Sequence, residues 1–272
     1  MQASPTIDRD RLSVLSGAIL LALALGRVVE LPAQTLLRRE IFGSPVGLNV
    51  SVATVMALLA MILSVIAAET LVRSHPRARS GQLPGSVVFW LLPGLMGLVL
   101  AGWLNQLDNL GLWTMAVLAA MVPVPVVLAA EYRAVHPSYR QGGWLNWLHT
   151  VVLYLVALGA FTLVYEARLR SLLSGTIIVL VTFLLSYRLF WPRLEGGRPP
   201  ALYAGVVAFL SGQLVWILNY WHLSGLRGGL LLLLFFYLLT GILLTGRFNR
   251  QLIIEYGSIT LIALLGIFLL AP

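Results

Sequence analysis

The heptapeptide pattern His-Pro-x-x-Arg-x-Gly occurs twice, as HPRARSG at residues 75–81 and as HPSYRQG at residues 136–142. Each copy follows a long apolar run that closes with Ala-Ala-Glu. A looser third copy, YRLFWP at residues 187–192, repeats the YRAVHP of residues 132–137 with tryptophan in place of histidine. Proline cannot continue a helix, glycine reverses the chain, and histidine or arginine is favourable at the negative end of a helix dipole. The motif therefore predicts the ends of successive helices.

The composition around these motifs is that of a membrane protein. The chain is 59% hydrophobic and only 10% charged, whereas a soluble domain carries roughly 25% charged residues. Its mean hydropathy is +0.92. One transmembrane helix needs about 20 apolar residues. The sequence therefore predicts an all-α fold, a polytopic helical membrane bundle of about nine transmembrane helices.

Nine apolar runs can be assigned along the chain. We interpret residues 32–45 as an interfacial connector, and the long run after it must tilt or leave the bilayer. Pro123 and Pro125 are expected to kink the fourth helix, and Pro93-Gly94 the third. The runs lie approximately at 12–29, 46–72, 87–104, 110–131, 145–165, 171–190, 201–220, 229–245 and 252–270.

The charges predict an orientation. All 18 basic residues are arginines, and the chain has no cysteine. These absences exclude lysine Schiff-base chemistry, thiol catalysis and thiolate metal sites. With the N-terminus inside, twelve arginines fall on inner segments and six on outer segments, which favours N-inside and C-outside. The inner set is Arg9, Arg11, Arg73, Arg77, Arg79, Arg133, Arg140, Arg188, Arg193, Arg198, Arg247 and Arg250.

The spacing of the motifs indicates an internal repeat within a single integral membrane domain, residues 1–272. The repeating unit is a helical hairpin, and because each copy holds two spans, the copies are parallel. Small residues at four-residue spacing predict the packing faces of three helices: Ala18, Ala22 and Gly26 on the first, Ala60, Ser64 and Ala68 on the second, and Ala204, Ala208 and Gly212 on the seventh. The eighth helix lacks such a stripe and is expected to face lipid. The hairpins are approximately 12–81, 86–142, 144–197 and 201–250, followed by a final helix at 252–270.

Ionisable residues near the inner edge are the candidate functional site, because charge inside a membrane usually serves a function. They could form a ring that binds an anionic headgroup or carries a proton. Equally, they could pair across neighbouring helices or extend to water. Arg27 and Glu30 are expected to form a local ion pair, and Gln213 an interhelical hydrogen bond. The candidate inner-face cluster is Glu69, Glu131, Arg133, His136, Arg188, Arg247 and Glu255.

Three functions are compatible with this pattern. The first is a non-catalytic membrane subunit or scaffold, because no catalytic, cofactor-binding or metal-binding constellation is recognisable. The second is a transporter or lipid-handling protein that uses the inner-face Glu/Arg cluster. The third is an enzyme acting on a lipid or isoprenoid substrate, with Glu69, Glu131 and His136 as its acid/base groups. The expected partners are the lipid bilayer and other membrane subunits but no nucleic acid, and the expected location is a prokaryotic plasma membrane.

Overall fold

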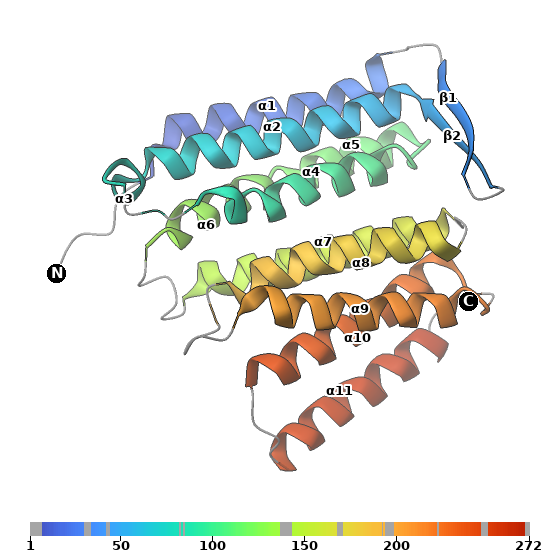
Figure 1. Ribbon diagram of the computed structural model, residues 1–272. Helices are drawn as coiled ribbons and strands as arrows, with labels where there is room; N and C mark the ends of the chain where they lie inside the picture. The colour runs from blue at the N-terminus through green and yellow to red at the C-terminus, as the bar shows by residue number, and fades with distance from the viewer. Residues whose placement is uncertain are drawn as a thin grey trace. The chain divides into compact units, whose positions relative to one another are not determined.

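The protein was analysed as a computed structural model, shown in Figure 1. The structure divides into two compact units, residues 1–136 (unit 1) and residues 137–272 (unit 2). Each unit is described by itself. The structure describes residues 7–29, 34–41, 44–81, 83, 85–136, 143–167, 171–191, 193, 199–221, 223–245 and 250–269.

Unit 1 contains four apolar spans and a β-hairpin. The second span packs most extensively against the third, and the first span contacts the second and the fourth. Figure 1 shows the first two spans side by side. The elements are α1 (Arg9–Val28), β1 (Gln34–Ile41), β2 (Ser44–Val50), α2 (Val52–Ser74), α3 (Pro76–Arg79), η1 (Val87–Phe89), α4 (Leu91–Leu104), α5 (Leu110–Ala120) and α6 (Pro123–Ala134).

The segment interpreted as an interfacial connector is an antiparallel β-hairpin. Gln34 of β1 pairs with Val50 of β2, and Ile41 pairs with Ser44. The apolar run at 46–72 is therefore not helical throughout, because its first residues belong to β2 and α2 begins at Val52. That the run tilts or leaves the bilayer stays a prediction. Ser51 sets the boundary, since its hydroxyl accepts the Thr54 N–H at 3.3 Å and caps α2.

The predicted small-residue face of α2 is buried against α4. Ala60, Ser64 and Ala68 are each 0% exposed. A Cβ added at Gly97 of α4 would lie 2.6 Å from Ser64 Oγ and 2.7 Å from the Ala60 carbonyl oxygen. The α2 and α4 backbones therefore approach so closely that only glycine fits. On α1 the prediction was partly wrong, because Ala22 is buried but Ala18 is exposed.

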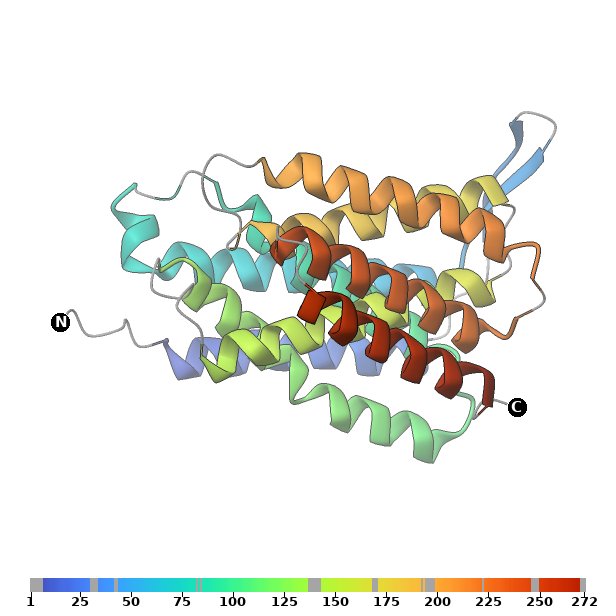
Figure 2. The same ribbon diagram turned by 90° about the horizontal axis from the view of Figure 1, so that it is seen from below.

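The third and fourth spans are both interrupted. The third span begins as η1 and becomes α-helical only at Leu91, so Pro93 lies in the first turn of α4. The N–H groups of a first turn have no partner within their own helix, so the proline, which lacks an N–H, is tolerated there. The expected kink at Pro93-Gly94 is thus a helix start instead. The kink expected at Pro123 and Pro125 is confirmed by a turn at Met121 and Val122 that separates α5 from α6 (Figure 2).

Unit 2 repeats the same order of neighbours with one helix more. Again the second span packs most extensively against the third, and the first contacts the second and the fourth. A Cβ at Gly212 would lie 2.5 Å from Val179 Cγ2, and Ala204 and Ala208 are buried on the same face, as predicted. The helices are α7 (Trp144–Glu166), α8 (Ser171–Phe190), α9 (Pro200–Leu218), α10 (Gly225–Thr245) and α11 (Arg250–Leu269).

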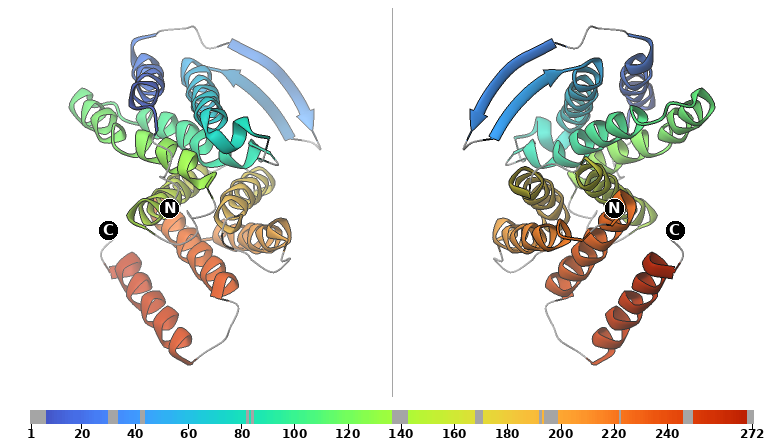
Figure 3. Two further views of the ribbon diagram at one scale, coloured as in Figure 1. Left: turned by 90° about the vertical axis from the view of Figure 1, so that its left-hand side faces the viewer. Right: turned by 90° about the vertical axis from the view of Figure 1, so that its right-hand side faces the viewer.

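The expectation that the eighth span faces lipid was wrong. Leu232, Phe236 and Thr240 of α10 are each 0% exposed, and Thr240 Oγ1 lies 3.0 Å from the Tyr154 hydroxyl of α7. Two glycines at the start of α10 let it approach α7 closely, so close packing does not require a full stripe of small residues. Figure 3 shows α11 beside α10.

The protein is a helical membrane bundle. Within the described residues, eight helical segments are long and apolar enough to cross a membrane. The final helix, α11, adds a shorter apolar stretch at Ile254–Ile267. The helical class is therefore confirmed, whereas nine crossings and the orientation of the termini stay predictions.

Candidate functional site

The seven residues of the candidate inner-face cluster are distributed over both units. Within unit 1, Glu131 is 0% exposed, whereas the Arg133 side chain is exposed. Within unit 2, Arg188 is 1% exposed and Glu255 is exposed. Arg247 lies outside the described residues. Burial thus separates Glu131 and Arg188 from the exposed members, and a single convergent cluster stays a prediction.

Both oxygens of the Glu69 carboxylate contact other side chains. Its Oε2 accepts a hydrogen bond from the indole N–H of Trp90 at 2.6 Å, and its Oε1 forms an ion pair with Arg73 one turn later. Trp90 is the last residue before α4, so this carboxylate links the end of α2 to the start of α4. Charge-assisted hydrogen bonds are among the stronger ones in proteins. Glu69 therefore acts as an interhelical tie.

His75 occupies a buried junction where α2, α3 and α6 end or begin. Its side chain is 1% exposed, and its Nδ1 accepts the Arg77 N–H at 3.2 Å. The proton of the neutral ring must therefore be on Nε2, which has no hydrogen-bond partner within the described residues. The ring centroid lies 4.9 Å from that of Tyr132 and 6.5 Å from that of His136.

This junction favours the neutral form of His75. Burial lowers its pKa, and the charges of His136 and Arg77 lower it further. Gly81 closes the motif with φ of 73°, a conformation that glycine adopts without strain. The first copy of the motif therefore reverses the chain as predicted. The second and third copies continue into Pro137 and Pro192, which lie outside the described residues.

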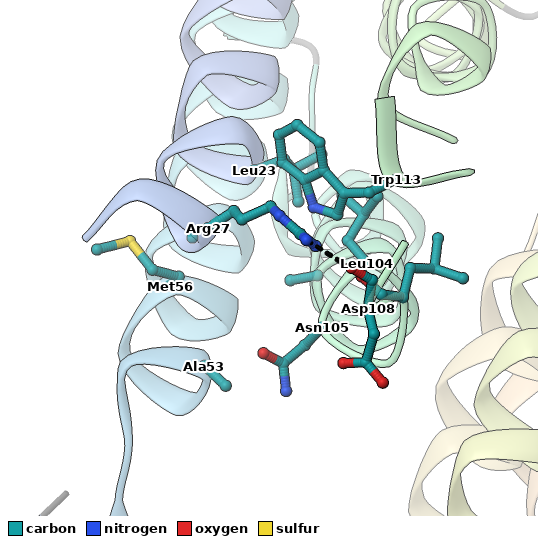
Figure 4. Close-up of a pocket in the computed structure, with 11 residues that line it drawn as sticks. Leu23, Arg27, Ala53, Met56, Leu104, Asn105, Asp108 and Trp113 are labelled. Atoms are coloured by element: carbon teal, nitrogen blue, oxygen red, sulfur yellow. Dashed lines mark hydrogen bonds between the residues drawn. The ribbon is translucent and has the colours of Figure 1, made fainter. Parts of the chain in front are cut away.

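Unit 1 has a cavity of about 390 Å³ at the opposite end of its helices. It lies between the last turn of α1, the first turns of α2, the end of α4 and the turn that leads into α5. Figure 4 shows Arg27 reaching across this space toward the α4–α5 turn. The lining residues include Leu23, Arg27, Met56, Asn105, Asp108 and Trp113.

Arg27 is held by the backbone of the α4–α5 turn. Its Nη1 donates to the Leu107 carbonyl oxygen at 2.7 Å, and its Nη2 donates to the Asp108 carbonyl oxygen at 2.6 Å. The guanidinium carbon lies 5.7 Å from the centroid of the Trp113 ring, within cation–π distance. These partners fix the position of the guanidinium without neutralising its charge.

The sequence did not predict this cavity. Arg27 was expected to pair with Glu30, which lies outside the described residues. The contacts of Arg27 are 80 and 81 residues away along the chain, so no local spacing could indicate them. Trp113 in the sequence indicates only that this part of the chain lies near the membrane–water boundary.

The described residues contain no group of three or more His, Asp or Glu side chains placed so that they could hold a metal ion. Gln213, expected to form an interhelical hydrogen bond, has an exposed side chain on α9. His149 is buried, at 4% exposure. Among the described residues, Arg27, Trp90, Tyr154, Tyr165 and Asn219 make side-chain hydrogen bonds to other elements, whereas many serine and threonine hydroxyls bond to the backbone of their own helix.

One protein family matches this chain over residues 32–270, a region that begins beyond α1 and runs through α11. The family is described as "Protein of unknown function (DUF5656)". No curated protein and no solved structure matches the chain. Since the matched region is well over half of the sequence, the protein belongs to the DUF5656 family.

Proposed function

We propose that this protein is a non-catalytic subunit or scaffold of a membrane assembly in a prokaryotic plasma membrane, and that it assembles with a second copy of itself through α9. One observation carries the proposal: five of the exposed side chains of α9 are spaced as in a heptad, with Leu210 and Ile217 exposed beside them. We call these five the α9 seam. Its members are Leu202, Val206, Phe209, Gln213 and Trp216.

The spacing of the seam is four, three, four and three residues. Positions repeating every 3.5 residues form the contact line of two supercoiled helices, in membranes as in water. Leu202 is 63% exposed and Phe209 is 62% exposed. Residues three and four apart share one face of any helix, so the spacing makes this face able to pack along a second helix, and the polar residue within it favours a partner over lipid.

Gln213 favours a second copy as the occupant of the seam. A side-chain amide carries both a donor and an acceptor, and leaving it unpaired in hydrocarbon is unfavourable. Two copies inserted in the same orientation are related by a two-fold axis along the membrane normal. Such an axis places α9 parallel to its counterpart and Gln213 opposite Gln213, where the two amides can hydrogen-bond to each other.

A structural role also agrees with how the charged residues are used. Glu69 links two helices through Trp90, and Arg27 links α1 to the α4–α5 turn. Neither group has a nucleophile as its identified partner. A transporter that uses the inner-face cluster would need its acids and arginines at one water-accessible site. None of the six cluster members that the structure describes lines the cavity at Arg27 or the apolar groove between α7, α10 and α11.

Disulfide cross-linking tests the proposal directly, because the natural chain has no cysteine. Phe209→Cys on the seam should form a covalent dimer when membranes are oxidised. Leu180→Cys is the matched control, since it is 57% exposed on α8 of the same unit and should stay monomeric. Co-expression of two differently tagged copies should yield dimers that carry both tags.

The contribution of the amide can be measured separately. Gln213→Leu should weaken the dimer by about threefold to thirtyfold in detergent, because an interhelical hydrogen bond contributes roughly 0.6–2 kcal/mol. Gln213→Asn, which keeps an amide, should retain part of the association. Monomers for Phe209→Cys, or equal cross-linking of both cysteine variants, would contradict assembly through the α9 seam.

A further inference from the structure

We propose that the cavity at Arg27 binds the headgroup of a zwitterionic phospholipid, with its phosphate near Arg27 and its amine near Asp108. We call this space the Arg27 cavity. The inference is independent of assembly through α9, because every lining residue belongs to unit 1. It rests on the charges, the walls and the position of the cavity.

The two charged side chains that line the cavity are not paired with each other. Within the described part of the chain, no ion pair connects Arg27 with Asp108, and no hydrogen bond to the Asp108 carboxylate is found. Arg27 donates two of its five N–H groups to backbone carbonyl oxygens, so three N–H donors and the full positive charge remain. One cavity wall is therefore cationic and another is anionic.

The side chains point so that a ligand can reach both charges. Figure 4 shows the Asp108 carboxylate and the Asn105 amide on the side of the guanidinium away from Trp113. A single anion would be repelled by Asp108, and a single cation would be repelled by Arg27. A ligand that carries both charges a few bonds apart satisfies the two walls together.

The remaining walls favour a lipid over a small water-soluble zwitterion. Leu23, Met56 and Leu104 give the cavity an apolar part, and three helix ends meet beside it. Trp113 at this level is typical of the boundary between headgroups and hydrocarbon. A volume of about 390 Å³ lies at the lower end of the range for ligand pockets. It fits a headgroup whose acyl chains remain in the surrounding bilayer.

Native mass spectrometry of the full-length, delipidated protein tests this assignment. Phosphatidylethanolamine, which carries phosphate and amine, should bind about fivefold better than phosphatidylglycerol, which lacks the amine; this is the size expected of a partly exposed ion pair. Asp108→Asn should make the two lipids bind equally. The folded protein should tolerate this change, because the backbone carbonyls that hold Arg27 remain.

Asp10→Asn is the matched control, since Asp10 is an exposed aspartate in the first turn of α1 and its replacement should keep the preference. Equal binding of the two lipids by the natural protein, or an unchanged preference in Asp108→Asn, would overturn the proposal. Phosphoethanolamine in excess should fail to displace the lipid. Displacement would overturn the lipid assignment in favour of a water-soluble zwitterion of the same chemistry.

Discussion

At the scale of single residues, the charges of this protein hold backbone and helices in place. Arg27 binds two carbonyl oxygens, and Glu69 binds an indole and a guanidinium. Each partner lies at a helix end, where backbone or side-chain groups are not otherwise satisfied. Charge at the edge of the membrane is thus used to fix the places at which helices begin and end.

Removing the tie at Glu69 should destabilise unit 1. Trp90→Phe deletes the indole donor and leaves the carboxylate with Arg73 and the Ser86 side chain, so the free energy of unfolding should fall by roughly 1.5–3 kcal/mol, the range for hydrogen bonds to charged groups. Thermal unfolding in detergent measures the loss. Trp147→Phe, at an exposed tryptophan of α7, is the control and should change little. Equal stability of the two variants would show that Glu69 is not a tie.

The buried His75 should make the protein sensitive to acid. Because its pKa is lowered in the folded state, the unfolded state binds a proton more readily, and stability falls as the pH drops below about 6.5. His75→Asn keeps an acceptor for the Arg77 N–H but cannot titrate. The melting temperature of this variant should fall less between pH 7.5 and pH 5 than that of the natural protein.

His136 and Tyr132 also face this junction, so a second substitution is needed. His136→Asn removes a half-buried neighbour and should leave most of the pH dependence in place. If His75→Asn and the natural protein lost stability in parallel on acidification, the buried ring would not be the source of the effect.

At the scale of the elements, close approach of two helices is the feature that holds each unit together. Gly97→Ala should lower the free energy of unfolding by about 1–3 kcal/mol, because the added methyl group would meet the α2 backbone and one of the two helices must move. Gly205→Ala on α9 is the control, since nothing lies within 4 Å of its added Cβ. The two melting curves should therefore separate clearly, and coincident curves would contradict the role of Gly97.

The sequence predicted elements well where the signal was local. Hydrophobic runs located the spans, prolines located the break between α5 and α6, and the small residues of α2 and α9 located their packing faces. The β-hairpin was missed because β1 mixes apolar and charged residues in a way that also suits an interfacial connector, and β2 is continuous with the apolar run of the second span. The packing of α10 was missed because its close contact with α7 is made by Gly228 and Gly229 at the start of the helix, and two adjacent glycines do not form a stripe along it.

The candidate site was harder to predict than the fold. Glu69 and His75 were recognised, and their partners Trp90 and Tyr132 lie in other elements. The Arg27 cavity depends on a turn 80 residues away, and such a contact exists only after the helices have packed. No periodicity in a single sequence indicates a contact between residues so far apart along the chain.

At the scale of the whole molecule, each unit contains its own set of mutually packed spans, with the same order of neighbours. The prediction that the four hairpins are copies of one another is compatible with this order. The one crossing between α3 and the α4–α5 turn can be placed by experiment. Residues before η1 and after α4 lie at opposite ends of one span.

Single-cysteine labelling should therefore find Ser80 and Gln106 on opposite sides of the membrane. Ser80→Cys should react only with reagent that reaches the cytoplasm, and Gln106→Cys only with reagent added outside. Gln106 is preferable to Asn109, whose side chain caps α5 by accepting two backbone N–H groups. Labelling of both positions from one side would contradict the nine-span arrangement. Ser138→Cys, outside the described residues, should behave like Ser80→Cys.

The turn between α5 and α6 has a mechanical consequence. Pro125 has no N–H to give to the Met121 carbonyl, so fewer backbone hydrogen bonds resist a change of angle there than within an unbroken helix. Membranes differ in hydrocarbon thickness, and an unbroken span must respond by tilting along its whole length. In this protein the fourth span can shorten by bending at one joint, which allows unit 1 to keep its packing in thinner and thicker bilayers alike.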